Sequence, residues 1–147
     1  MFQQMKKRIK NEKGLTLIEL LAVIVILAIV AAIAIPAIGN IIDNSKNKAL
    51  KSDAANIISA AQIYYADGGS GTFTVTGSGA TSTGSGNSYV KLGDTTVSTQ
   101  ITVTEAGAIS GALSKGEKTL TLTSATLSDI KIDSGESIAG KAVISKQ

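Results

Sequence analysis

The sequence predicts an α+β protein in which a long N-terminal helix carries a small antiparallel β-sheet head packed on its second half. Two observations predict this class. An apolar stretch over residues 15–35 continues without a linker into a helical stripe, and short alternating segments separated by glycine turns follow Asp67. The simplest assembly places about four strands against the amphipathic half of the helix. A length of 147 residues suits one small head beside one long helix.

Residues 1–14 form a basic leader that contains one acid, Glu12. Its basic residues are Lys6, Lys7, Arg8, Lys10 and Lys13. Basic segments that precede an apolar helix stay in the cytoplasm. The whole chain has 14 basic and 11 acidic residues, so the remainder keeps nine and ten, a net −1. The overall charge of +3 therefore does not indicate nucleic-acid binding.

Residues 15–36 predict a transmembrane helix. Only Thr16 and Glu19 are polar before Ile35, and the stretch is long enough to cross a hydrocarbon core of about 30 Å. A carboxylate in such a helix is costly and usually has a partner. Thr16 and Glu19 also have the spacing of a capping box, which is compatible with a second role for Glu19.

Residues 37–67 predict an amphipathic helix that continues the first one. Its apolar stripe is Leu50, Ala54, Ile57, Ala61 and Tyr64. Pro36 and Gly39 predict a kink where the two halves join, because proline lacks an N–H and clashes with the preceding turn. Asp67-Gly68-Gly69 predicts the helix end, since glycine adopts the left-handed conformation of a C-cap.

Residues 68–88 are rich in Gly, Ser and Thr and predict a flexible loop. Residues 89–147 predict the β-sheet head. Its expected strands are residues 89–92, 97–104, 118–123, 129–132 and 141–144. Turns are expected at Gly93-Asp94, Ala106-Gly107, Lys115-Gly116, Ser134-Gly135 and Gly140.

The composition argues against an enzyme. The chain has no cysteine and no histidine, which removes thiol nucleophiles, the commonest general base and zinc sites. We expect no cofactor and no metal. The acids Asp129, Asp133 and Glu136 miss the EF-hand spacing and favour a polar turn. Nucleic acid is not an expected partner, because the cluster of Lys46, Lys48 and Lys51 has flanking acids and no interleaved aromatic residues.

The N-terminal segment resembles the type IV prepilin signature: a basic leader, Gly14 before the scissile bond, Glu19 five residues into the mature chain, and an apolar helix. The resemblance implies cleavage between Gly14 and Leu15, N-methylation of Leu15, and a role for Glu19 in aligning incoming subunits. Pro36 stands where the family commonly has a proline. The absence of cysteine fits a disulfide-poor exporter such as a Gram-positive bacterium.

The resemblance implies a structural pilin subunit of a type IV pilus (a fimbrium) or a related filament, in which the helix of residues 15–36 would form the filament core. Implied partners are identical subunits in a helical homopolymer, a prepilin peptidase, a platform protein and an assembly ATPase. The precursor is expected as a single-pass protein of the cytoplasmic membrane, and the mature form as a cell-surface filament serving adhesion or motility. Two alternatives stay open: a pseudopilin or minor pilin for secretion or DNA uptake, and a membrane-tethered binding module that does not polymerise.

Overall fold

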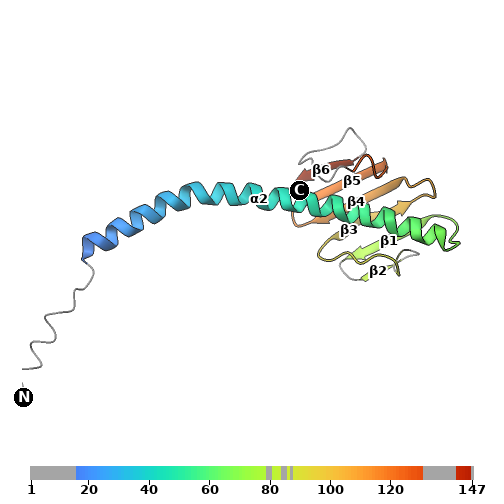
Figure 1. The fold of residues 1–147 in the computed structure, drawn as a ribbon, viewed down its shortest axis with the longest axis horizontal. Coiled ribbons are helices and arrows are strands. Elements are labelled where there is room, and N and C mark those ends of the chain that lie inside the picture. Colours follow the sequence, from blue (N-terminus) through green and yellow to red (C-terminus); the bar gives the residue numbers. More distant parts are fainter. Residues whose placement is uncertain (1–15, 79–80, 84–85, 87, 131–141, 147) are drawn as a thin grey trace, which may run out of the picture. The chain divides into compact units, whose positions relative to one another are not determined.

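A computed structural model of the chain describes residues 16–78, 81–83, 86, 88–130 and 142–146. These residues form one helix and six strands (Figure 1), namely α2 (Leu17–Ala66), β1 (Phe73–Ser78), β2 (Thr81–Thr83), β3 (Thr96–Val103), β4 (Ile109–Lys115), β5 (Lys118–Ala125) and β6 (Ala142–Lys146). The predicted α+β class is confirmed. The chain divides into two compact units, Met1–Asn40 and Ile41–Gln147.

The described part of the first unit is an apolar helix with exposed side chains. Its leucine, isoleucine and valine side chains are between 49% exposed, at Val23, and 90% exposed, at Leu17. Within the described residues α2 is the one helix long and apolar enough to cross a membrane, with a mean hydropathy of 3.1 over its most apolar stretch. An apolar surface of this extent requires lipid or other protein chains to cover it.

The end of α2 is set by two glycines. The N–H of Gly69 donates to the carbonyl of Tyr64 at 2.9 Å, and the N–H of Gly68 donates to the carbonyl of Tyr65 at 3.1 Å. Gly68 has φ of +86°, the left-handed conformation that this pair of bonds requires. The helix end predicted at Asp67-Gly68-Gly69 is therefore confirmed.

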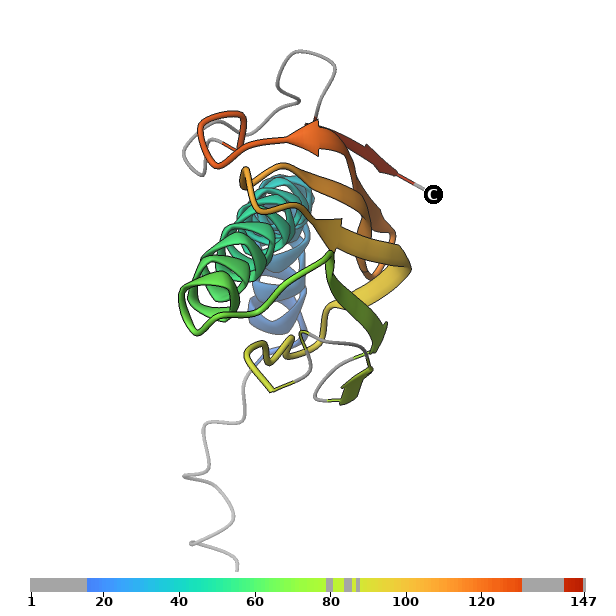
Figure 2. The same ribbon diagram turned by 90° about the vertical axis from the view of Figure 1, so that its right-hand side faces the viewer.

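In the second unit the helix lies along one face of the sheet (Figure 2). The strand order is β2-β1-β3-β4-β5-β6, and every neighbouring pair is antiparallel. The helical stripe is confirmed, since Leu50, Ala54, Ile57 and Ala61 are 0–1% exposed. They pack against inward-facing strand residues that include Val75, Ile101, Leu113, Leu120 and Leu122.

Two strand predictions are confirmed, residues 97–104 as β3 and residues 118–123 as β5, and the one at 141–144 overlaps β6. The prediction of a strand at 89–92 is wrong. The N–H groups of Tyr89 and Val90 both donate to the carbonyl of Gly86, at 3.1 and 3.2 Å, so the backbone closes a turn there. The buried side chains of Val90 and Leu92 explain why the segment has strand-like alternation.

The prediction that residues 68–88 form a loop is also wrong in part, because β1 and β2 lie there. Phe73 and Val75 bury completely, and their backbones pair with Val103 and Ile101 of β3. These backbone hydrogen bonds and two apolar side chains outweigh the loop-like composition. The structure likewise adds β4, which the sequence did not predict.

The turns at Ala106-Gly107 and Lys115-Gly116 are confirmed by positive φ at Gly107 (+79°) and Gly116 (+62°). The expected strand at 129–132 begins instead with Asp129 in a turn, and its last two residues lie outside the described residues. The turns expected at Ser134-Gly135 and Gly140 also lie outside them.

Candidate functional site

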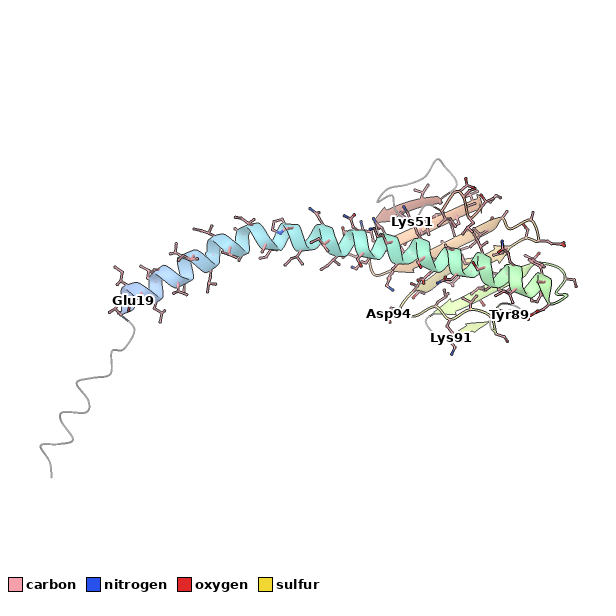
Figure 3. All side chains as sticks on the ribbon, in the orientation of Figure 1. Glu19, Lys51, Tyr89, Lys91 and Asp94 are labelled. Atoms are coloured by element: carbon pink, nitrogen blue, oxygen red, sulfur yellow. The ribbon has the colours of Figure 1, made fainter. Side chains whose placement is uncertain are left out.

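The candidate site is the first turn of α2, which carries Glu19 (Figure 3). Thr16 lies directly before the helix and contacts Glu19. Glu19 Oε2 accepts hydrogen bonds from the Thr16 N–H and the Thr16 Oγ1, both at 2.8 Å. In return the Glu19 N–H lies 3.0 Å from the Thr16 carbonyl and 3.4 Å from Oγ1. This reciprocal arrangement is a capping box, which satisfies amides that a helix start leaves free.

The capping box uses only one oxygen of the Glu19 carboxylate. Among the described residues no hydrogen bond reaches Oε1, and the side chain is exposed. The neighbouring side chains of Leu17, Ile18 and Leu20 are apolar and themselves more than half exposed. Glu19 is therefore a carboxylate on an apolar helix surface that has one oxygen available to a donor from another molecule.

Two of the predicted site residues, Gly14 and Leu15, lie outside the described residues. The cleavage and methylation positions therefore stay predictions. The predicted kink at Pro36 and Gly39 also stays a prediction. Helical structure continues through both residues, and no atom lies within 4 Å of the position that a Cβ would take at Gly39.

The three lysines predicted as one basic cluster face different surroundings. Lys51 is 2% exposed and lies on the helix face that packs against the sheet, and burial lowers the pKa of its ammonium group. Lys48 is exposed, and Lys46 is half-buried beside the β4–β5 turn. A continuous lysine stripe along the helix is therefore absent among these three residues.

The acids considered for calcium binding are only partly described. Asp129 Oδ2 accepts from the N–H and Oγ1 of Thr126, at 2.9 and 2.8 Å, which is the same local motif as at the start of α2. Asp133 and Glu136 lie outside the described residues. Within the part of the chain that the structure describes, no three His, Cys, Asp or Glu side chains gather in a metal-binding arrangement.

One cluster escaped the sequence analysis. Four of the five aromatic residues of the chain, Tyr64, Tyr65, Phe73 and Tyr89, meet at the end of α2 with ring centroids 5.3–6.4 Å apart. Tyr89 donates to Asp67 Oδ2 at 3.4 Å. The pKa of Tyr89 is raised, because neighbouring groups partly desolvate the exposed phenol and the Asp67 carboxylate repels its ionised form. The available signal was compositional, since so few aromatic residues concentrate between positions 64 and 89.

Comparison with protein families finds one match. The family of the prokaryotic N-terminal methylation motif matches residues 9–35, which include Gly14, Leu15 and Glu19. No curated protein and no solved structure matches the chain. The N-terminal segment thus carries a type IV prepilin signal, which is consistent with a pilin-like protein. The signal implies processing by a prepilin peptidase and fits a membrane-anchored precursor.

Proposed function

We propose that this pilin- or pseudopilin-like precursor is a structural subunit of a type IV pilus or a related filament. One observation carries the proposal. A carboxylate with a free oxygen stands in the first turn of an exposed apolar helix, immediately after the prepilin signal. A helix that only anchors a head in lipid gains nothing from a carboxylate there, whereas a polymer gains a means of aligning its subunits.

Processing prepares the partner of this carboxylate. Cleavage between Gly14 and Leu15 creates a new amino group on Leu15, which the proposal takes as the N-methylated terminus. The amine and Glu19 then lie four residues apart on each subunit. Within one subunit the Glu19 Oε2 already accepts two hydrogen bonds from Thr16, so the open Oε1 suits the amine of a neighbouring subunit.

The alignment follows from the energetics of the apolar core. Moving an apolar helix from lipid into a bundle of identical helices gains little hydrophobic free energy, so packing and polar pairs decide the register. A subunit out of register leaves a buried amine or carboxylate without its counter-charge, which costs roughly 3–5 kcal/mol. The amine–carboxylate pair therefore favours one axial position for each incoming subunit.

Assembly would start from the cytoplasmic membrane, where α2 holds the precursor, and end at the cell surface. The proposed partners are a prepilin peptidase, a platform protein, an assembly ATPase and identical subunits in a helical homopolymer. Imaging of sheared appendages separates a pilus from a pseudopilus by length and abundance.

The test replaces Glu19 with alanine in cells that express this chain as their only subunit. We expect cleavage to survive, because the leader and the scissile bond are unchanged. Membrane insertion should survive as well, because alanine keeps the helix propensity and the hydrophobicity of the segment. Filaments should be lost or greatly reduced, since each subunit would bury an amine without its partner. Electron microscopy of sheared filaments and mass spectrometry of their N-terminus, expected at Leu15, are the measurements.

Glu105→Ala is the matched control, because it removes an exposed carboxylate from the β3–β4 turn of the head and should leave filaments normal. Normal filaments from Glu19→Ala would contradict the alignment role. Filaments whose subunits retain residues 1–14 would contradict the cleavage. If the unaltered chain never forms filaments, a membrane-tethered binding module becomes the better explanation.

A further inference from the structure

One end of the head concentrates lysines. Lys118 Nζ lies 3.3 Å from Asp43 Oδ2, which ties the β4–β5 turn to the first turns of the helix in the second unit. The position that a Cβ would take at Gly116, in the same turn, lies 3.3 Å from Lys46 Nζ. Lys115 ends β4 beside them, and Lys48 follows on an exposed face of the helix. We name Lys46, Lys48, Lys115 and Lys118 the lysine end.

The opposite end of the head has a different charge. There the hydroxyl of Tyr65, near the end of α2, lies 2.8 Å from the carbonyl of Val103, the last residue of β3. The β3–β4 turn that follows carries the exposed Glu105 and no lysine, and Asp67 ends the helix nearby. The helix and the strands therefore run between a lysine-rich end and an acidic end.

Two members of the lysine end, Lys46 and Lys48, lie near the start of the second unit. They are therefore close in the sequence to the apolar segment. Lys46 follows Ile35 by about three helical turns at 3.6 residues per turn. Between them Ile38, Ile41 and Ile42 are 48–67% exposed, so exposed apolar side chains lie about one to two helical turns before Lys46. Exposed isoleucines suit the acyl chains of a bilayer, and the lysines that follow suit the phosphates at its surface.

The acids at this end do not cancel the lysines. Asp43 is engaged by Lys118, Glu117 lies in the turn itself, and Asp94 precedes β3. Apart from the Asp43–Lys118 ion pair, the other three lysines of the lysine end remain beside two acids among the described residues.

We propose that the lysine end binds the phosphate groups of anionic phospholipids while the subunit is held in the membrane before assembly. This proposal rests on the membrane-inserted precursor of the proposed function but not on polymerisation. The Asp43–Lys118 pair holds the β4–β5 turn against the helix, and Gly116 in that turn lies next to the ammonium group of Lys46. In the bound head, the lysine end would contact the bilayer surface and the acidic end would point away from it.

The experiment uses the full chain in vesicles and exploits its lack of cysteine. Thr96→Cys, exposed at the start of β3 opposite Ser114, places a single fluorophore at the lysine end. Ala106→Cys, exposed in the β3–β4 turn, places the same fluorophore at the opposite end. Vesicles contain either phosphatidylcholine alone or phosphatidylcholine with phosphatidylglycerol, together with a lipid whose headgroup carries a quencher.

We expect stronger quenching at position 96 in the anionic vesicles than in the neutral ones, and no such difference at position 106. Salt at about 1 M, where the screening length is about 3 Å, should abolish the difference. The triple change Lys46→Gln, Lys48→Gln and Lys115→Gln should reduce the ratio of surface-bound heads to free heads on the order of a hundredfold. Each lysine near an anionic surface raises that ratio roughly fivefold. The matching triple change to arginine should keep the quenching.

Equal quenching at position 96 in neutral and anionic vesicles would overturn the proposal. Quenching that rises with protein density in neutral vesicles would also overturn it and assign the lysine end to contacts between copies of the chain. Filament formation is scored separately with the glutamine variant. Because the vesicle assay needs only insertion, a failure of lipid binding is distinguishable from a failure to polymerise.

Discussion

At the scale of single residues, one tyrosine hydroxyl connects three segments of the head. Tyr65 Oη accepts the N–H of Phe73 at 3.0 Å and lies 2.8 Å from the carbonyl of Val103 and 2.9 Å from that of Gly71. It therefore joins the end of α2 to β1 and to β3. The sequence could place Tyr65 beside the helical stripe, but it could not show this role, because the three partners come from separate segments.

Tyr65→Phe should destabilise the head by about 1–3 kcal/mol, because the partly buried Phe73 N–H would lose its acceptor. Tyr89→Phe is the matched control. Its hydroxyl is exposed and lies 3.4 Å from Asp67, so its loss should change the free energy of unfolding by less than about 0.5 kcal/mol. Urea unfolding of the detergent-solubilised chain, followed by near-ultraviolet circular dichroism, measures both. Equal losses for the two variants would contradict the connecting role.

Lys51 gives the head a defined pH dependence. Burial holds the pKa of its ammonium below the ordinary value of 10.5, so between the folded pKa and 10.5 the unfolded state binds more protons. The contribution of Lys51 to stability therefore rises with pH across that window. Tyr89 acts in the opposite sense above pH 10.0, because its raised pKa makes the folded state bind more protons than the unfolded state.

Lys51→Met should remove the rising contribution. The free energy of unfolding of this variant should therefore increase less from neutral pH to pH 10.5 than that of the unaltered head. Lys48→Met, on an exposed part of the same helix, should leave the pH dependence unchanged. Urea titrations at the two pH values provide the comparison. An equal change in the free energy of unfolding with pH for the unaltered head and for Lys51→Met would contradict this assignment.

At the scale of elements, the predictions succeeded where apolar periodicity is regular. The continuous apolar run and the stripe that follows predict α2, and the alternation of threonine and leucine at 119–123 predicts β5. The strand β4 escaped because Ser110 and Gly111 interrupt its alternation. Its register shifts beside Gly111, and such an irregularity depends on the neighbouring strands and not on local sequence.

Gly111 should be the glycine that β4 can least replace. Its φ is +134°, and an added Cβ would lie 2.6 Å from the Gln100 carbonyl oxygen and 2.9 Å from the Ile101 Cα. Gly111→Ala should therefore cost about 1–3 kcal/mol or more, because the backbone of β3 must move. Gly93→Ala, where nothing lies within 4 Å and φ is not positive, should be nearly neutral. Thermal unfolding of both variants measures the contrast, and an unchanged melting temperature for Gly111→Ala would contradict it.

At the scale of the whole molecule, the two units differ in whether their apolar side chains are buried. The first exposes apolar side chains along the helix, and the second holds every buried core residue that the structure describes, beginning with Leu50. The candidate site could be predicted from the sequence because Glu19 and Thr16 are three residues apart on one helix. The aromatic cluster and the lysine end could not, because each depends on strands that fold back from distant positions.

The division predicts that residues 37–147 fold without the apolar segment. Deleting the residues before position 37 removes no buried side chain that the structure describes. The fragment should be soluble, monomeric and indifferent to reductant, because the chain has no cysteine. Within it Leu50→Ala should cost about 2–5 kcal/mol, because Leu50 is fully buried, whereas Ile42→Ala should change little at its half-exposed position. Circular dichroism and urea titration test the fragment. An unfolded fragment, or equal losses for the two variants, would mean that the head depends on the membrane segment for its core.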